Sequence, residues 1–385
     1  MLSSLGGNEY CRSYVAINLD AIEHNLNEMK KRIANGVKSL AIVKANAYGH
    51  GSVTVSKYIE DKIDYFAVAG LEEAIELRDG GITKPILVLS YTPPMLYEEL
   101  VEHNVTATIY NCEEAKLLSN VATAKGRSAK IHIAVDTGMG RIGFWPDESG
   151  VAAVEEIMSL DNIEVEGLFS HYACADCDDA TTSIKQNELF DWFIKKLEEK
   201  GIFIPIKHMC NSAGTMEYDK QYNMCRIGMA LYGLYPSEEV NTGNVDLIPA
   251  MEVISRVVHV KDVPKGYKIG YGHAYEAPDK RKIATVSIGY ADGYKRCFTD
   301  GGFVLINGKK APVVGKVCMD LIMVDVTDIA DVSVGTKVVV LGESEGARIT
   351  AEELGAMGHS FNYEIICTFM QRVPRLYYSQ GKLVE

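Results

Sequence analysis

Short apolar runs alternate with longer stretches of helical periodicity over residues 14–233. Strands that alternate with helices pair in parallel, because each helix crosses back over the sheet. About eight such units in a segment of this length favour an α/β fold, a (β/α)8 barrel of the TIM type, over an open sheet. The expected strands are residues 14–17, 39–43, 65–68, 86–89, 106–109, 130–135, 165–169, 206–209 and 224–227. The expected helices are residues 20–33, 72–78, 112–118, 151–160 and 187–200.

After residue 240 strands dominate the pattern. A chain of 385 residues is long enough for two domains. We therefore predict a barrel domain over residues 14–240 and a C-terminal β-rich domain over residues 241–385, which residues 1–13 join. The expected strands of the second domain are residues 252–260, 283–288, 303–306, 321–326 and 337–341, with one helix at 350–357.

Charge and composition exclude several classes of protein. A net charge of −13 argues against a nucleic-acid partner. No apolar run is long enough to span a bilayer, and residues 1–10 lack the basic and apolar regions of a signal peptide. Nine cysteines, an odd and scattered set, do not form a disulfide framework. We expect a cytoplasmic protein with a small-molecule substrate.

Lys44 ends the apolar run of residues 40–43 and precedes Tyr48 and Gly49-His50-Gly51. Desolvation at the end of a buried strand would lower the pKa of the amine and make it a usable nucleophile or base. The alternative is a lysine that leaves the strand and extends into solvent. The glycines would let a ligand approach the backbone closely, and the Tyr48 phenol could hold a phosphate oxygen. A Schiff-base lysine beside a phosphate site is what pyridoxal 5'-phosphate requires.

Other polar residues fall where predicted barrel strands end, which is where (β/α)8 barrels carry their active sites. Arg226 lies among apolar residues and must be paired if it is buried. His171 is either a loop histidine with satisfied hydrogen bonds or part of the site. Backbone N–H groups of Gly228 and Met229, or the Ser212 hydroxyl, could bind a phosphate. The strand-end set is Lys44, Asp136, Arg141, His171, Asn211, Ser212 and Arg226.

Two motifs have competing interpretations. Residues 138–143 match G-x-G-x-x-G, but the dinucleotide site of an NAD-dependent dehydrogenase would need a helix to begin within the motif. Phe144-Trp145-Pro146 follows instead, so we interpret the glycines as a loop that presents Arg141. Cys174 and Cys177 form a CxxC pair without the second pair of ligands that a structural zinc site needs. We therefore predict no metal site.

Taken together, the segments 43–50, 136–141 and 318–320 and Tyr271 resemble the alanine racemases, a pyridoxal-phosphate family with a (β/α)8 barrel and a C-terminal β domain. The resemblance extends from residue 14 to residue 375. It implies an isomerase that interconverts L- and D-alanine by transfer of the Cα proton between two bases, and so supplies D-alanine for peptidoglycan. It also implies a homodimer in which Tyr271 reaches the site of the partner subunit.

The resemblance assigns roles by position. Lys44 would bind the cofactor covalently and act as one base, and Tyr271 would be the other. Arg141 would steady Tyr271 and the substrate carboxylate, and His171 would lie against the cofactor ring. The implied cofactor-binding residues are Lys44, Tyr48, His171, Asn211, Ser212, Arg226, Gly228, Met229 and Gln371. The implied substrate-binding residues are Arg141, Met319, Tyr290, Asp320 and Gln371, with Asp176 and Arg296 at the entrance.

The residue types suit this chemistry. A phenol in water loses its proton only near about pH 10, so cationic Arg141 would be needed to stabilise the phenolate of Tyr271. Arg226 would face the pyridine nitrogen, and a guanidinium donates a hydrogen bond but effectively never gives up its proton. We hypothesise that this arrangement favours reprotonation at Cα over transamination.

Three positions depart from the family pattern. Ala134 stands where a carbamylated lysine is frequent, and Lys316 replaces an arginine, which loses the planar fork. Gln371 replaces a tyrosine that touches both the phosphate and the catalytic tyrosine. Serine racemases of the vancomycin-resistance type carry a small polar amide at this last position, and an amide could hydrogen-bond a substrate hydroxyl. A serine racemase, or an enzyme that uses both amino acids, is therefore the alternative.

Overall fold

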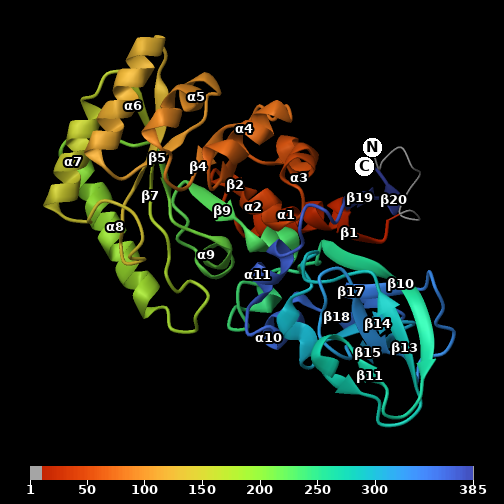
Figure 1. Cartoon of the computed structure of the whole chain (residues 1–385). Helices are drawn as coiled ribbons and strands as arrows, with labels where there is room; N and C mark the ends of the chain where they lie inside the picture. The colour runs from red at the N-terminus through yellow and green to blue at the C-terminus, as the bar shows by residue number, and fades with distance from the viewer. Residues whose placement is uncertain (1–10, 385) are drawn as a thin grey trace. The chain divides into compact units, whose positions relative to one another are not determined.

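The structure is a computed structural model that describes residues 11–384 (Figure 1). Residues 1–10, where we expect no signal peptide, lie outside the described residues. The chain forms two compact units. The barrel unit comprises residues 21–47 and 51–249, and the β unit comprises the described parts of residues 1–20 and 250–385 together with residues 48–50. Over the described residues, no helix combines the length and apolarity needed to cross a bilayer.

Eight parallel strands form the barrel unit, in the order β4-β3-β2-β9-β8-β7-β6-β5. A parallel bridge between Leu87 and Thr106 joins the two ends of this order and closes the ring. The predicted α/β barrel is therefore confirmed. The strands are β2 (Lys38–Ile42), β3 (Tyr65–Val68), β4 (Ile86–Val88), β5 (Ala107–Ile109), β6 (Ala129–Ala134), β7 (Ile163–Phe169), β8 (Ile206–His208) and β9 (Met224–Ile227).

Helices connect these strands, and local capping defines several of their ends (Figure 1). The Asn111 side chain accepts a hydrogen bond from Glu113 N at the start of α6, and Asp147 accepts from Ser149 N and Gly150 N at the start of α7. Four short helices, α2, α3, α5 and α9, were not predicted, because fewer than three turns give little periodicity to detect. The helices are α1 (Leu19–Arg32), α2 (Lys44–Tyr48), α3 (Ser52–Ile59), α4 (Leu71–Asp79), α5 (Tyr97–Glu102), α6 (Cys112–Lys125), α7 (Glu148–Met158), α8 (Thr181–Glu199) and α9 (Ser212–Glu217).

The β unit is built on a ten-stranded sheet around the long strand β10 (Met251–Val263). Strand β1 (Ser13–Asn18) pairs antiparallel with β10 and parallel with β19 (Arg375–Ser379). The prediction that residues 14–17 belong to the barrel was therefore wrong, because an apolar run indicates a strand without indicating its sheet. The predicted domain limits of 14–240 and 241–385 stay a prediction.

The remaining elements of the β unit follow the predicted strand-rich pattern. Val263, Ile269, Ala277, Ile283 and Val314 form a small buried core within the β unit. The strands are β11 (Lys268–Ile269), β12 (Tyr275–Glu276), β13 (Arg281–Val286), β14 (Phe303–Ile306), β15 (Lys309–Pro312), β16 (Ile322–Asp325), β17 (Lys337–Ser344), β18 (Ala347–Ile349) and β20 (Lys382–Leu383). The helices are α10 (Ala351–Met357) and α11 (Asn362–Cys367).

Candidate active site

Lys44 follows β2 after one residue, Val43, and begins α2, a left-handed helical turn. Ala45, Asn46 and Ala47 have φ of 53°, 54° and 53° with ψ between 47° and 49°, which is left-handed helical backbone. Such backbone costs an L-residue about 1–2 kcal/mol, so a run of three persists only where surrounding contacts hold it.

Neighbouring elements supply those contacts. Glu73, on α4, accepts a hydrogen bond from Ala45 N at 2.6 Å and another from Ala69 N at 2.7 Å. The Asn46 side chain accepts from Ser52 N at 2.9 Å. The turn that follows Lys44 is therefore anchored to the start of α3 and to α4, and the lysine begins from a fixed backbone.

Arg226 is the buried centre of the site, with 2% of its surface exposed. Its Nη1 donates to His208 Nδ1 at 2.8 Å. Its Nη2 donates to His171 Nδ1 at 2.9 Å and to the carbonyl oxygens of Ser170 at 3.0 Å and Met209 at 2.9 Å. The sequence-based expectation that Arg226 is paired is confirmed, although its partners are histidines and carbonyl groups. Among the described residues its Nε–H has no protein partner, which leaves that donor for a ligand.

His171 is hydrogen-bonded to Arg226, and its pKa also depends on the charges of Arg141 and Lys44. Burial, together with the charges of Arg226, Arg141 and Lys44, lowers the pKa of His171 to about 3. The structure thus brings these four predicted residues together on the barrel unit. A neutral imidazole close to three cationic groups makes a site of positive potential, which suits anionic groups such as phosphate and carboxylate.

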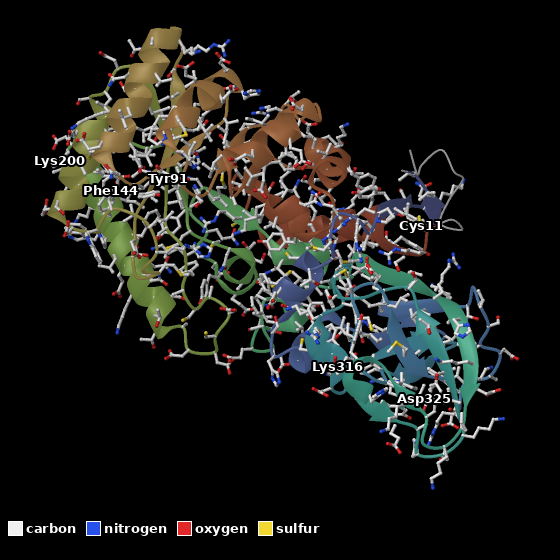
Figure 2. The ribbon with its side chains drawn as sticks, viewed as in Figure 1. Cys11, Tyr91, Phe144, Lys200, Lys316 and Asp325 are labelled. Atoms are coloured by element: carbon white, nitrogen blue, oxygen red, sulfur yellow. The ribbon has the colours of Figure 1, made fainter. Side chains whose placement is uncertain are left out.

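A loop after β6 carries Arg141. The Asp136 side chain accepts from Gly138 N and Gly140 N, both at 3.0 Å, and so shapes the glycine-rich turn. Phe144, labelled in Figure 2, ends the loop with its N–H bonded to Ala134 O at 2.9 Å. No helix begins within residues 138–147, all of which the structure describes, and the next helix is α7. The interpretation as a loop is therefore confirmed, and the dinucleotide-binding alternative lacks its helix.

Ser212 and the segment after β9 form a second group of donors. Ser212 Oγ accepts from Gly228 N at 2.9 Å and from Ala230 N at 3.4 Å, which leaves its own O–H free to donate elsewhere. Asn211 caps α9 by accepting from Gly214 N at 2.9 Å. Met229 is buried. The structure therefore brings Asn211, Ser212 and Gly228 together, as the sequence predicts.

The other predicted site residues lie on the β unit. Tyr271 begins a short 3-10 turn (Tyr271–His273) and is 69% exposed. Met319 is 53% exposed, and Ala291 N donates to its carbonyl oxygen at 3.0 Å. Tyr290 N donates to Cys318 O at 3.0 Å, so Tyr290 and Met319 share one strip of backbone.

Charged contacts hold Asp320 next to this strip. Arg372 donates to Asp320 at 2.7 Å and to the fully buried Asp292 at 2.7 Å, and Arg12 pairs with Asp292 from the other side. Gln371 and Arg296 are exposed, and Lys316 (labelled in Figure 2) lies in the same unit. Asp176 lies on the barrel unit, where its carbonyl oxygen accepts from Ser237 Oγ at 2.6 Å.

Tyr48 belongs to the β unit although it follows Lys44 closely in sequence. Burial raises the pKa of its phenol, and the neighbouring Tyr363 raises it further. The Tyr48 and Tyr363 rings meet edge to face, with centroids 6.3 Å apart. Tyr48 is therefore a protonated phenol at neutral pH, with an O–H group that can act as a donor.

Two family models match the chain. The model of the alanine racemase N-terminal domain covers residues 17–236, and that of the alanine racemase C-terminal domain covers residues 250–377. The chain belongs to the alanine racemase family.

Individual members of the family match over almost the whole chain. The alanine racemase of Clostridium tetani is 43% identical over 96% of each chain, and that of Methanococcus maripaludis is 46% identical over 94% of this chain and 98% of its own. The structure of the Clostridium difficile alanine racemase has a TM-score of 0.94 at 41% identity and covers 97% of both chains. The Bacillus anthracis alanine racemase with bound L-Ala-P has a TM-score of 0.93 at 38% identity and covers 98% of this chain and 97% of its own.

Some residues that shape this family member's site were not predicted from its sequence. Gln186, on α8, donates to His171 O at 2.9 Å and accepts from Ala173 N at 2.9 Å, so it fixes the loop that begins with His171. Its sequence signal is a polar residue at helical spacing from the buried Phe190 and Phe193. Glu73 was missed because its bonds to Ala69 N and Gly70 N at the start of α4 are a local capping arrangement, and only its bond to the distant Ala45 N connects it to the site.

Proposed function

We propose that this chain is an alanine racemase, an isomerase that interconverts L- and D-alanine with pyridoxal 5'-phosphate, and that it works in the cytoplasm to supply D-alanine for peptidoglycan. Relatives that carry this name match 94–97% of the chain. The observation that carries the proposal is the buried Arg226 guanidinium bonded to His171 at 2.9 Å, with Lys44 and Arg141 near enough for their charges to help lower the pKa of that imidazole.

The residues present fit the cofactor. Lys44 supplies the amine that would bind the aldehyde, and the unpaired Nε–H of Arg226 would donate to the pyridine nitrogen. The Ser212 O–H and the backbone around Gly228 and Met229 would hold the phosphate, with Asn211 fixing the start of α9 and Tyr48 and Gln371 contributing further contacts. The cofactor, when bound, supplies an electron sink that makes the substrate Cα–H acidic.

Two side chains would handle the Cα proton. Inversion at Cα requires one base on each face of the substrate. We assign these roles to Lys44 Nζ and Tyr271 Oη, so that one removes the proton from Cα and the other delivers a proton from the opposite side. Arg141 would bind the substrate carboxylate and stabilise the Tyr271 phenolate, while His171 would lie against the cofactor ring. Proton transfer by positioned groups of this kind contributes about 10²–10⁴-fold in rate.

The β unit would complete the site of a second copy of the chain. Tyr271 and Met319 are large side chains that leave 69% and 53% of their surface exposed. A homodimer in which Tyr271, Met319, Tyr290 and Asp320 face the partner's barrel would bury them and bring the second base to Lys44. Gln371, with Asp176 and Arg296 at the entrance, would complete the substrate pocket.

Borohydride reduction tests the covalent part of the proposal. The protein is loaded with pyridoxal 5'-phosphate, reduced and digested, and the peptides are analysed by mass spectrometry. We expect the reduced cofactor on Lys44, and racemisation of L-alanine in the unreduced sample. Lys44→Ala should show neither, whereas Lys38→Ala, at the exposed start of β2, should show both. Attachment at another lysine, or racemisation by Lys44→Ala at the wild-type rate, would contradict the assignment.

A further inference from the structure

Three buried polar side chains, Arg226, His208 and His132, form a row in the barrel unit that ends at Glu166, whose side chain is 11% exposed. Arg226 Nη1 lies 2.8 Å from His208 Nδ1, and His208 Nε2 lies 2.9 Å from His132 Nδ1. His132 Nε2 lies 3.5 Å from Glu166 Oε2, an ion-pair distance, and neither of these two atoms has a hydrogen-bond partner within the described part of the chain. The row connects the active-site end of β9 to the middle of β7 by way of β8 and β6.

The chemistry of the two ends fixes the direction of every hydrogen bond in the row. A guanidinium only donates, so His208 must accept at Nδ1 and carry its proton on Nε2. That proton is donated to His132 Nδ1, so His132 also carries its proton on Nε2, where it faces the Glu166 carboxylate. Burial lowers the pKa of both histidines, which keeps them neutral. Burial opposes ionisation of Glu166, but contacts with His132 and Lys130 outweigh it and lower its pKa to about 2.

The surrounding backbone is built to hold this row. Glu166 is the extra residue of a β-bulge, since Ile131 pairs with Val165 whereas His132 pairs with Gly167. A Cβ on Gly167 would lie 2.4 Å from His132 Nδ1, so only glycine leaves room for the ring. Phe169 stacks on His208 with centroids 4.9 Å apart and planes 10° apart. Lys130 Nζ donates to Glu166 Oε1 at 3.1 Å and fixes the far end.

Arg226 needs a counter-charge that its direct contacts do not supply. It is 2% exposed, and no carboxylate of residues 11–384 lies within ion-pair distance of it. A buried, uncompensated charge costs several kcal/mol. The aligned imidazoles offer a compensation, because neutral rings that donate in one direction are polarised by a cation at one end and an anion at the other.

We propose that Glu166 is the remote counter-charge of Arg226, and that His132 and His208 are positioning residues that hold the guanidinium through this one-way row of donors. With Nη1 fixed by His208 and Nη2 by the carbonyl groups and His171, the Nε–H keeps a single orientation. The inference rests on the proposed function only in the final step, where that Nε–H meets the pyridine nitrogen.

Nitrogen-15 NMR of the full-length protein tests the row without cofactor chemistry. In protein labelled at histidine, the shifts of both ring nitrogens report the tautomer. We expect His132 and His208 to be neutral and protonated on Nε2 at pH 7. A cationic ring, or a proton on Nδ1 of either histidine, would overturn the proposal whether or not the protein racemises alanine.

The positioning role is tested by Glu166→Gln, which keeps the shape and removes the charge. We expect the shifts of His132 and His208 to move and kcat for alanine to fall about tenfold, as typical for loss of an outer-shell partner. KM should change less than about twofold, because the row faces the cofactor side of the site. The matched control is Glu164→Gln, a 53%-exposed carboxylate 3.8 Å from the same Lys130, which should leave shifts and kcat unchanged.

A second variant guards against misfolding of the first. Gly167→Ala keeps every charge but displaces the His132 ring, so it should reproduce the fall in kcat and the shift of His208. Unchanged His208 shifts in both Glu166→Gln and Gly167→Ala would overturn the proposal. If the wild-type protein did not racemise alanine while the tautomers were as expected, the proposed function would fail and the row would stand.

Discussion

At the scale of single residues, the neutral state of His171 links the stability of the protein to pH. Its pKa is lowered from 6.5 to about 3 in the folded protein by burial and by Arg226, Arg141 and Lys44. Between these values the unfolded chain binds the proton and the folded chain does not, so stability rises with pH through this window and is lost as pH falls.

We therefore expect the free energy of unfolding to drop between pH 7 and pH 5, with about 2 kcal/mol of the drop due to His171. Urea denaturation at the two pH values measures the loss. His171→Gln should show a smaller drop than the wild type, because glutamine does not titrate. An equal drop in both proteins would mean that His171 is not held neutral.

The second residue-scale prediction concerns Gln371 and the choice between alanine and serine as substrate. The family pattern has a tyrosine here, and Gln371 is exposed on the β unit. An amide that hydrogen-bonds a substrate hydroxyl would favour serine, so Gln371→Tyr should lower the ratio of kcat/KM for serine to that for alanine by about tenfold or more. Lys316→Arg is the control. It restores the family residue at another departing position and should leave the ratio unchanged. An unchanged ratio in Gln371→Tyr would show that Gln371 does not contribute to substrate specificity.

At the scale of elements, the left-handed turn of α2 depends on Asn46. This residue has φ of 54°, and its side chain accepts from Ser52 N at 2.9 Å. Asn46→Ala should lose both the tolerance of asparagine for this backbone and the hydrogen bond, which costs about 1–3 kcal/mol when it leaves a donor unpaired. Covalent loading of the cofactor on Lys44 should slow as well.

Asn104→Ala is the matched control for this element. Asn104 also has a positive φ, of 50°, but it is exposed. It should therefore lose less stability than Asn46→Ala in urea denaturation, and cofactor loading should not change. Equal losses in the two variants would show that the Ser52 contact does not stabilise the turn.

The same scale shows what the sequence could predict. The ends of apolar runs placed Lys44, His171 and Arg226 at or next to the ends of β2, β7 and β9, as the structure has them, because strand ends determine where a barrel carries its polar rim. The run at residues 14–17 was placed in the wrong sheet, since pairing partners are set by tertiary contacts. The row from Arg226 to Glu166 was also missed. The bulge at Glu166 changes which side chains face inward, and no local pattern indicates a bulge.

At the scale of the whole molecule, the division into two units separates the two proposed bases. Lys44 belongs to the barrel unit and Tyr271 to the β unit. If Tyr271 acts across a dimer, each active site combines Lys44 of one chain with Tyr271 of the other. A two-fold symmetric dimer then holds two such composite sites.

Mixing two inactive variants tests this arrangement. Lys44→Ala and Tyr271→Phe should each be inactive as homodimers. In a hybrid dimer one composite site carries both substitutions and the other carries neither, so half of its sites are intact. After dissociation and random reassociation, we expect about one quarter of the wild-type racemase activity.

Mixing Lys44→Ala with Arg226→Ala is the control. Both residues belong to the barrel unit of one chain, so neither composite site is intact and no activity should return. Failure of the Lys44→Ala and Tyr271→Phe mixture to recover activity, with hybrid dimers verified by affinity tags, would assign both bases to a single chain.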